Sequence, residues 1–416
     1  MGIAMRTLIL IILTVCPLLF LAYAESPVVA TGIEVLRARK FDILQGKRVG
    51  LITNPTGVDA TLHSTIDILS KAPGVKLVAL FGPEHGARGD FAAGDNVDTY
   101  TDARTGIPVY SLYGKTHKPT PEMLKGIDVL VYDIQDNGCR SYTYISTMGK
   151  AMEAAAENNI PFVVLDRPNP LGGNRVEGNC VEPGWESFVG QYAIPYVYGL
   201  TCGELATMLN DEKMLANKAH CALTVVPMNG WRREMVFAQT GLPWVPASPH
   251  IPQENSSMFY AATGVLGELG VISEGVGYTL PFELLAAEWI DPLMMADRMN
   301  ALNLPGVIFR PITFKPFYGQ WTGKTLHGVQ IHLVDQQKVD LLGIQFLFLQ
   351  VHQELYPAKD PFHSADSSRV RMFDKVMGTS RMRREFTKRY TYADIKPGMD
   401  AEAKAFMAKA KKYMLY

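Results

Sequence analysis

Carboxylates in polar loops are the residues of this chain best suited to catalysis. Glu84 lies in the loop Gly82-Pro83-Glu84-His85-Gly86, directly after an apolar run, where a partly buried carboxyl group could act as a general acid. Asp133, Asp136 and Asp166 follow other apolar runs. Cleavage of a glycosidic bond needs one carboxylic acid to protonate the leaving oxygen and usually a second carboxylate as nucleophile or base. The simpler alternative is that these carboxylates only cap helices and turns or pair with nearby arginines.

Arginine and tyrosine side chains accompany the carboxylates. Arg88 follows Glu84, Arg167 follows Asp166, and Arg140, Tyr142 and Tyr144 follow Asp136. Arginine binds carboxylates in a bidentate manner, and tyrosine offers both a ring face and a hydroxyl group. These residues could bind a ligand beside the carboxylates, although Arg88 could equally form an ion pair with Glu84.

A metal site is the rival chemistry, because histidines and aspartates crowd one region: His85, Asp90, Asp95, Asp98 and His117. Their spacing matches neither HExxH nor an EF-hand, and His85 is better explained as a hydrogen-bonding partner. The phosphate-binding patterns GxGxxG and GxxxxGK[ST] are absent, as is the GxSxG turn of serine hydrolases. We therefore expect no metal and no cofactor.

The elements that position these loops form a regular alternation. Short apolar runs predict strands at residues 48–53, 75–81, 107–112, 127–134 and 162–166, and helical periodicity covers 61–71 and 143–158. In the first of these helices, Leu62, Ile66 and Leu69 should share the buried face. Such βαβ units form a mostly parallel sheet, and ligands bind at the carboxyl ends of its strands. Four polar loops follow predicted strands there, beginning at Asn54, Gly82, Asp133 and Asp166.

The remaining segments suggest a leader and a second domain. Residues 1–24 carry one charge, an apolar run and the pattern Ala22-Tyr23-Ala24, which is typical of a cleaved signal peptide; the run is too short for a stable membrane anchor. We expect a periplasmic or secreted protein. Residues 25–185 should form the Rossmann-like domain. Residues 186–416 should form a smaller α+β domain, with strands at 222–226, 307–314 and 329–334 and helices at 339–355 and 401–414.

Composition restricts the partners. The net charge is −1, and the chain has no lysine- and arginine-rich tract, which argues against nucleic acid or an anionic membrane. With 47% hydrophobic residues the chain can bury a large core. Beyond the leader it has four cysteines, Cys139, Cys180, Cys202 and Cys221, which could form one disulfide or remain buried thiols.

Three segments carry a family resemblance: residues 81–89 (FGPEHGARG), 133–144 (DIQDNGCRSYTY) and 165–170 (LDRPNP). They resemble the NamZ-type exo-β-N-acetylmuramidases, and looser similarity continues at 201–206, 248–252 and 273–283. The resemblance thus covers nearly the whole chain after the leader. It implies a Rossmann-like domain facing a smaller domain across a cleft that contains the active site. It also implies release of N-acetylmuramic acid from the non-reducing end of peptidoglycan fragments, so that the expected partner is a muropeptide-derived sugar.

The resemblance assigns candidate roles. Glu84 takes the catalytic acid position, and Asp133 and Tyr144 complete the catalytic candidates. Arg140 is our first choice for the lactyl carboxylate. The substrate-binding candidates are Asn54, His85, Arg88, Gln135, Asp136, Arg140, Tyr142, Asp166, Arg167, Asn169, His250 and Glu268.

The chain also departs from the family pattern. Val276 and Tyr278 flank Gly277 where many members have Gly-Arg-Gly-Thr, and His250 ends a segment that is commonly Pro-Ser-Pro-Asn. A changed sugar or leaving-group preference would follow from such differences. Two other functions stay open at this stage: a non-catalytic wall-sugar-binding protein, and a metal-dependent hydrolase of another envelope substrate.

Overall fold

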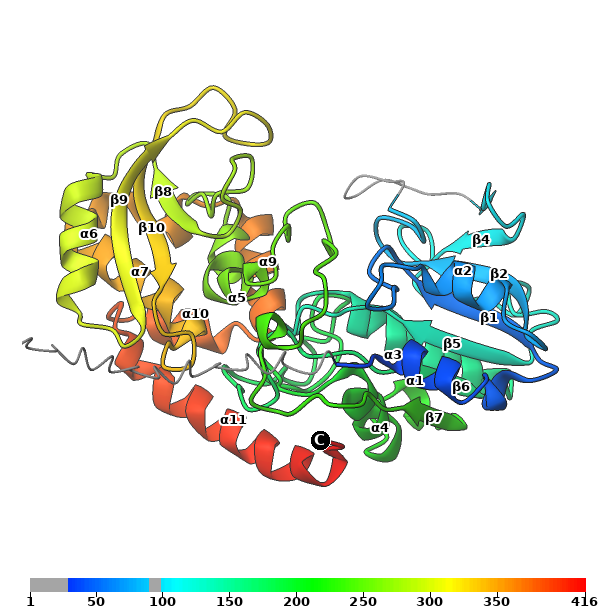
Figure 1. Ribbon diagram of the computed structural model, residues 1–416. Helices are drawn as coiled ribbons and strands as arrows, with labels where there is room; N and C mark the ends of the chain where they lie inside the picture. Colours follow the sequence, from blue (N-terminus) through cyan, green and yellow to red (C-terminus); the bar gives the residue numbers. More distant parts are fainter. Residues whose placement is uncertain (1–28, 90–98) are drawn as a thin grey trace, which may run out of the picture.

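The first domain is built on a seven-stranded sheet. The computed structural model describes residues 29–89 and 99–416, so the predicted leader, Asp90, Asp95 and Asp98 lie outside the described residues. Strand order is β3-β4-β2-β1-β5-β6-β7, and every neighbouring pair is parallel except β3 with β4. The strands are β1 (Arg48–Thr53), β2 (Lys76–Gly82), β3 (Tyr100–Thr101), β4 (Pro108–Ser111), β5 (Val129–Asp133), β6 (Phe162–Leu165) and β7 (Leu223–Val226). The predicted mostly parallel sheet is confirmed (Figure 1).

Helices cover both faces of this sheet. They are α1 (Gly32–Ala38), α2 (Thr65–Ser70), α3 (Tyr144–Glu157) and α4 (Cys202–Asp211). Successive side chains of β1 point to opposite faces, so Leu51 packs in the core with α1 and α2, whereas Ile52 packs in the core with α3 and α4. The alanine-rich sequence of α3 favours a helix, and a capping box between Thr201 and Glu204 starts α4.

Helix α2 is shorter than its periodicity predicts. The Ser64 side chain accepts a hydrogen bond from the backbone N–H of Ile66 and so caps the helix there. Leu62 lies before this cap with a φ of 65° and is 55% exposed, so it does not share the buried face with Ile66 and Leu69. The prediction that Leu62 belongs to this helix face was wrong.

The first sheet uses residues beyond 185, where we expected the second domain to begin. Strand β7 pairs with β6 from Phe162↔Leu223 to Leu165↔Val226, and α4 packs against both strands. The segment predicted as a second-domain strand at 222–226 is therefore the last strand of the first sheet.

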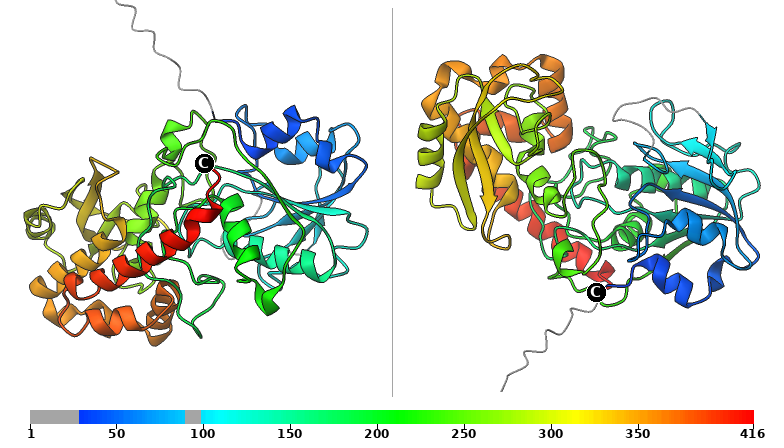
Figure 2. Two further views of the ribbon diagram at one scale, coloured as in Figure 1. Left: turned by 90° about the horizontal axis from the view of Figure 1, so that it is seen from below. Right: turned by 45° about the horizontal axis from the view of Figure 1, so that its top comes forward.

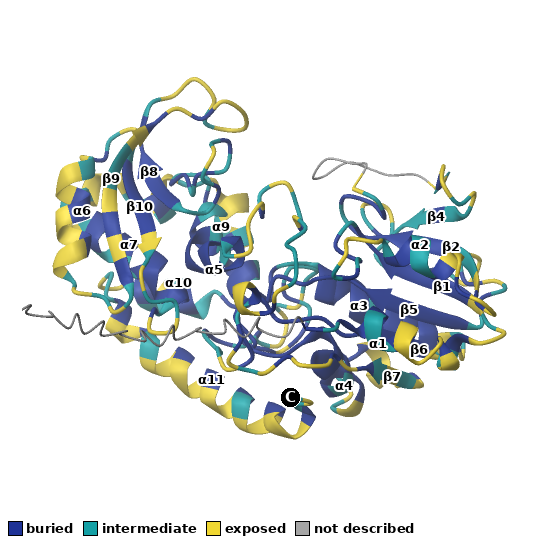
Figure 3. Ribbon diagram, in the orientation of Figure 1, coloured by how far each residue is buried: buried dark blue, intermediate teal, exposed yellow. Residues whose placement is uncertain are grey.

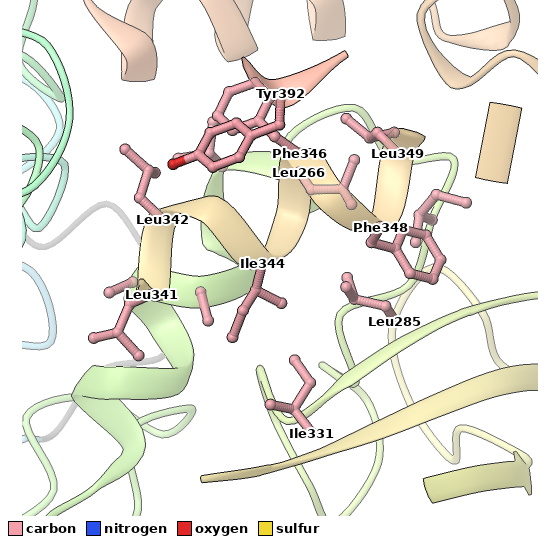
Figure 4. Close-up of a cluster of buried hydrophobic side chains, with 14 of the residues drawn as sticks. Leu266, Leu285, Ile331, Leu341, Leu342, Ile344, Phe346, Phe348, Leu349 and Tyr392 are labelled. Carbon is pink, nitrogen blue, oxygen red and sulfur yellow. The ribbon is translucent and has the colours of Figure 1, made fainter. Parts of the chain in front are cut away.

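The second domain contains a three-stranded antiparallel sheet of order β8-β10-β9. Its strands are β8 (Leu284–Ala287), β9 (Val307–Phe314) and β10 (Leu326–Leu333). Its helices are α5 (Ser256–Gly267), α6 (Pro292–Ala301), α7 (Leu341–Leu355), α8 (Pro361–Ser364), α9 (Ser367–Met377) and α10 (Arg381–Phe386). Side chains of α7 such as Phe346 and Phe348 fill the core beside Leu266, Leu285 and Ile331 (Figure 4).

Helix α11 (Lys396–Ala410) joins the two domains. Met399 packs in the second-domain core, whereas Phe406 and Tyr413 pack in the first-domain core beside α3 and α4. Figure 2 shows this helix, in red, running along both domains. Its outer face is exposed, whereas the central strands β1, β5 and β6 of the first sheet are almost entirely buried (Figure 3).

Short 3₁₀ segments complete the secondary structure: Asp42–Leu44, Ala216–Lys218, Phe237–Gln239, Pro357–Lys359, Tyr392–Asp394 and Lys411–Tyr413. No helix within residues 29–89 and 99–416 combines the length and hydropathy that a membrane-spanning helix needs. Cys139, Cys180, Cys202 and Cys221 are all free thiols.

Candidate active site

A cavity of about 370 Å³ lies between the two domains, within the size range of small-molecule sites. The first domain contributes loops that follow β2, β4 and β5, and the second contributes α5 and the segment before β8. The lining residues are Glu84, His85, Tyr113, Ser141, Tyr142, Thr143, Tyr144, Phe188, Val189, Ser248, Pro249, His250, Ile251, Tyr260, Glu268 and Phe282.

The loop after β2 presents Glu84 to this cavity. The chain folds back directly after the strand, so that a Cβ on Gly82 would lie 2.8 Å from the backbone nitrogen of Ala87. His85 has a φ of 72°, a conformation that costs a residue with a side chain on the order of 1–3 kcal/mol and is typical of functional loops. The half-buried Glu84 carboxylate accepts a hydrogen bond from the hydroxyl of Tyr113.

Tyrosine hydroxyls surround Glu84. The rings of Tyr142 and Tyr144 meet edge to face at 4.9 Å, and Tyr142 meets Tyr260 of the second domain in the same way at 5.6 Å. Burial, together with the charge of Glu84, raises the pKa of Tyr113 to about 12 and raises those of Tyr142 and Tyr144 as well. These hydroxyls therefore stay protonated at neutral pH. Tyr113 donates to Glu84 and Tyr144 donates to the carbonyl of Ala247, whereas the hydroxyl of Tyr142 remains for a substrate or for developing negative charge.

The second domain supplies another carboxyl group, Glu268, at the end of α5. Burial raises its pKa, and the positive charge of Arg369 partly offsets that effect. Among the lining residues in the described parts of the chain, Glu84 and Glu268 are the two carboxyl groups, and they come from opposite domains. A pair of carboxyl groups is the set of side chains that most glycosidases use to cleave a glycosidic bond.

Two histidines complete the polar lining. Burial lowers the pKa of His250, and the neighbouring His85 lowers it further. His250 is therefore a neutral hydrogen-bonding group near pH 7.

A larger cavity, of about 450 Å³, lies elsewhere between the domains. Its arginines already have partners: Arg175 pairs with Glu177 and donates to the carbonyl of Val339 at 2.7 Å, and Arg233 pairs with Glu204 at 2.6 Å. It contains none of the residues that we predicted for the site. The 370 Å³ cavity is therefore the better candidate.

Six of the predicted residues line the 370 Å³ cavity: Glu84, His85, Tyr142, Tyr144, His250 and Glu268. The other nine are not among its lining residues: Asn54, Arg88, Asp133, Gln135, Asp136, Arg140, Asp166, Arg167 and Asn169.

Asp133 and Arg167 form a buried ion pair beneath the loops. Arg167 Nε and Nη2 donate to the two carboxylate oxygens of Asp133, at 2.5 and 3.0 Å, and Thr65 donates to the same carboxylate. Asp133 is fully buried. This geometry fixes the end of β5 against α2 and does not bring Asp133, predicted as catalytic, to the cavity.

Asp136 and Asp166 are also enclosed. The Asp136 carboxylate accepts hydrogen bonds from Tyr198 and from the backbone N–H of Gly138, and Asp166 accepts one from Thr201 at 2.7 Å. Burial raises the pKa of each carboxyl group to about 6, against the effect of these donors. Both residues hold loops together.

The predicted residues with amide side chains also form hydrogen bonds within the protein. Gln135 donates to the Pro168 carbonyl at 2.7 Å, Asn169 donates to the Leu200 carbonyl at 2.9 Å, and Asn54 accepts from the backbone N–H of Thr56 at 3.0 Å. The contacts of Gln135 and Asn169 connect neighbouring loops at the edge of the sheet, and that of Asn54 stabilises the turn after β1.

The predicted arginines have partners within the protein. Arg140 is fully buried and donates to the backbone carbonyls of Asn179, Ile194 and Val376 at 2.6–2.9 Å. Arg88 pairs with Asp67 and Asp102. The structure therefore gives Arg140 a structural role and does not bring it to the cavity.

Sequence reasoning missed several lining residues. Tyr113 follows the predicted strand at 107–112, so the rule that ligands bind at carboxyl ends of strands could have identified it. Ser248 and Phe282 lie in the segments 248–252 and 273–283, whose looser family resemblance could have identified them. Phe188 and Tyr260 come from segments for which neither a strand end nor a resemblance was noted.

Within the described residues, no group of three or more histidine, cysteine or acidic side chains could hold a metal ion. His117, one of the proposed ligands, stacks on Phe188 with ring centroids 3.9 Å apart.

Comparison with known proteins identifies relatives along most of the chain. Family models for the N-terminal and C-terminal domains of exo-beta-N-acetylmuramidase NamZ match residues 49–255 and 258–416. The peptidoglycan beta-N-acetylmuramidase NamZ of Bacillus subtilis (strain 168) is 47% identical over 393 residues, covering 94% of this chain and 92% of that protein.

Two crystal structures of DUF1343 family proteins from Bacteroides fragilis NCTC 9343 share the fold. One has a TM-score of 0.90 at 57% identity, and the other has a TM-score of 0.74 at 28% identity. Each comparison covers 93% of this chain and 99% of the other.

Proposed function

We propose that this chain, which belongs to the exo-β-N-acetylmuramidase NamZ family, hydrolyses the bond that links a terminal N-acetylmuramic acid to the rest of a peptidoglycan fragment. The observation that carries this proposal is the position of Glu84 in an interdomain cavity beside tyrosine hydroxyls and opposite the carboxyl group of Glu268. The 47% identity to a peptidoglycan β-N-acetylmuramidase supports the same substrate class.

Glu84 acts as the general acid in this proposal. In its protonated form it donates a proton to the oxygen that joins the terminal sugar to the leaving group, which departs as an alcohol. A water molecule adds to the anomeric carbon, and Glu268, the second carboxyl group, acts in its ionised form as the base that takes a proton from this water or as the nucleophile that precedes it. Tyr113 donates its hydroxyl hydrogen to Glu84 and so orients this carboxyl group. Among the described lining residues, the Tyr142 hydroxyl and the His250 imidazole, rather than a guanidinium, are the groups proposed to bind the lactyl carboxylate.

Substitution of Glu84 tests this role. Glu84→Gln keeps the size of the side chain but cannot donate a proton to a sugar oxygen, so turnover of a MurNAc-GlcNAc disaccharide should fall at least about a hundredfold. Turnover of a nitrophenyl glycoside of MurNAc by the same variant should fall less, because nitrophenolate leaves readily as an anion without being protonated. The matched control is Glu254→Gln, an exposed glutamate outside the cavity lining, which should keep wild-type turnover.

Each other outcome has a defined meaning. An equally severe loss on both substrates would make Glu84 the nucleophile or base, and wild-type turnover by Glu84→Gln would remove it from the mechanism. Loss of wild-type activity on chelation, with recovery on added zinc or calcium, would favour a metal-dependent hydrolase. Sugar binding without any turnover by the wild type would favour a non-catalytic wall-binding protein.

Export of the protein is part of this proposal. The charge distribution, apolar run and Ala22-Tyr23-Ala24 pattern of residues 1–24 support removal of a signal peptide near Ala24 and a periplasmic or secreted mature protein. A substrate derived from the cell wall is found in the same compartments.

A further inference from the structure

We propose that the side chains of Phe317 and Tyr318, here called the aromatic platform, bind a sugar ring on the leaving-group side of the cleaved bond. The platform lies in the connection between β9 and β10, which projects from the second domain (Figure 1). This inference rests on the proposed function, because it assigns a second part of the same substrate.

The aromatic platform is exposed to an unusual degree. Phe317 is 62% exposed and Tyr318 is 43% exposed. Single exposed apolar residues are ordinary, but adjacent exposed aromatic rings, here 5.4 Å apart, form a surface that is typical of a binding site. Most of the surrounding connection is exposed as well (Figure 3).

Specific contacts hold the platform in place. The backbone N–H of Phe317 donates to the carbonyl of Gly277 at 2.8 Å, and the Gln320 side chain donates to the carbonyl of Gly270 at 2.7 Å. A Cβ on Gly277 would lie 2.3 Å from the Tyr318 carbonyl oxygen, so only glycine allows this close approach. The ring of Tyr278 lies 6.2 Å from that of Phe317 and supports it from the side. The rings are therefore positioned before a ligand arrives.

The platform continues the surface of the catalytic cavity. His250 lines the cavity, and its ring lies nearly parallel to that of Tyr318, at 14° with centroids 5.9 Å apart. Gly270, which anchors the connection through Gln320, lies two residues after Glu268 of the cavity lining. A substrate whose terminal sugar occupies the cavity can therefore extend across His250 to Tyr318 and Phe317.

A sugar ring is the occupant that fits these faces. A pyranose presents axial C–H groups on one face, and the negative face of an aromatic ring attracts them. The neighbouring cation Lys324 forms an exposed ion pair with Glu288 at 2.7 Å, and Lys315 is exposed in the same connection, so the test below distinguishes a sugar from an anionic stem peptide as the occupant. Tyr278, which supports Phe317, is one of the residues at which this chain departs from the family pattern.

Three peptide-free substrates test the platform: the nitrophenyl glycoside of MurNAc, the MurNAc-GlcNAc disaccharide, and a tetrasaccharide with MurNAc at the non-reducing end. For Phe317→Ala and Tyr318→Ala, kcat/KM on the tetrasaccharide should fall about tenfold, mainly through KM, because an aromatic contact is lost. The nitrophenyl glycoside, which has no sugar to reach the platform, should be affected far less. Tyr318→Phe keeps the ring and should restore the wild-type value.

The matched control is Leu293→Ala, which removes a side chain that is 65% exposed on α6. It should leave all three substrates unaffected. If kcat/KM of the alanine variants falls on both the disaccharide and the tetrasaccharide, the first leaving-group sugar binds the platform. If it falls on the tetrasaccharide alone, the next sugar binds there. Both results support the proposal.

Wild-type kcat/KM of both alanine variants on the tetrasaccharide would overturn the proposal. An equal fall in kcat/KM of the alanine variants on all three substrates would also overturn it, as would a fall that appears only when stem peptides are attached to the substrate. Failure of the wild type to cleave any substrate would instead refute the proposed function. Calorimetric binding of the tetrasaccharide to the wild type and to Phe317→Ala would then still test the platform, because it requires no turnover.

Discussion

Replacement of Arg140 should destabilise the protein far more than it changes substrate choice. Its guanidinium is fully buried and donates to three backbone carbonyls, and one of these, of Val376, belongs to the second domain. Burial lowers the pKa of Arg140 to about 10, but the group remains charged near pH 7. The side chain is therefore a charged connection between the loop after β5 and α9.

The magnitude follows from the groups that lose their donor. In Arg140→Ala, three buried carbonyls lose a charged donor, at ~1–3 kcal/mol each. Removal of a buried charge returns several kcal/mol, so a net loss of about 3–5 kcal/mol is expected. With about 2.1 cal/mol/K of unfolding entropy per residue, the thermal midpoint should fall by about 4–6 °C. Arg140→Lys keeps the charge but not the planar fork, so its loss should be smaller.

Thermal and urea unfolding of the variants, followed by circular dichroism, measures this loss. The control is Arg232→Ala, because Arg232 is 61% exposed and its ion pair with the exposed Glu234 is screened by solvent and should contribute little to stability. The same samples are assayed on MurNAc and GlcNAc glycosides. An unchanged unfolding midpoint for Arg140→Ala, together with lost preference for MurNAc, would refute this structural role and restore Arg140 as the partner of the lactyl carboxylate.

The remaining predictions concern pH and the N-terminus. Burial raises the folded-state pKa of Asp136 from 3.8 to about 6, so the wild type should lose stability as pH rises between these values. Asp136→Asn lacks this titration, so its free energy of unfolding, measured with urea, should rise relative to that of the wild type between pH 4 and 7, by up to about 3 kcal/mol. If the free energies of unfolding of the two proteins changed with pH in the same way, the raised pKa of Asp136 would be contradicted. N-terminal sequencing of protein from its native host should find Glu25 first, and an intact Met1 would contradict export by a cleaved leader.

Much of the first domain could be predicted because its elements are encoded by local patterns. The run at residues 48–53 coincides with β1, and the alanine-rich segment predicted at 143–158 contains α3. Strand β9 also has its predicted bounds of 307–314. By contrast β8, Leu284–Ala287, is four residues long and contains no β-branched residue, so only its pairing with β10 makes it a strand.

The site could be predicted where its side chains lie in loops at the carboxyl ends of strands. Glu84 and Tyr144 lie directly after or near such ends and line the cavity. Asp133 occupies the same kind of position, but its side chain points to Arg167, and residue type alone cannot distinguish these two outcomes. Glu268 was named through the family resemblance and not through a strand end. Tyr260 was not named, because its place in the cavity depends on its contacts with Ser141 and Tyr142, which are distant in the sequence.

Helix α11 also has a consequence for the order in which the chain can complete its folding. Phe406 and Tyr413 cover apolar surface of α3 and α4, yet roughly 170 residues separate the end of β7 from the start of α11. A chain that emerges from its N-terminus onward, across a membrane or from a ribosome, therefore presents all strands of the first sheet before the cover of the core beside it. Chains that stop before Lys396 leave this apolar surface of α3 and α4 exposed to solvent.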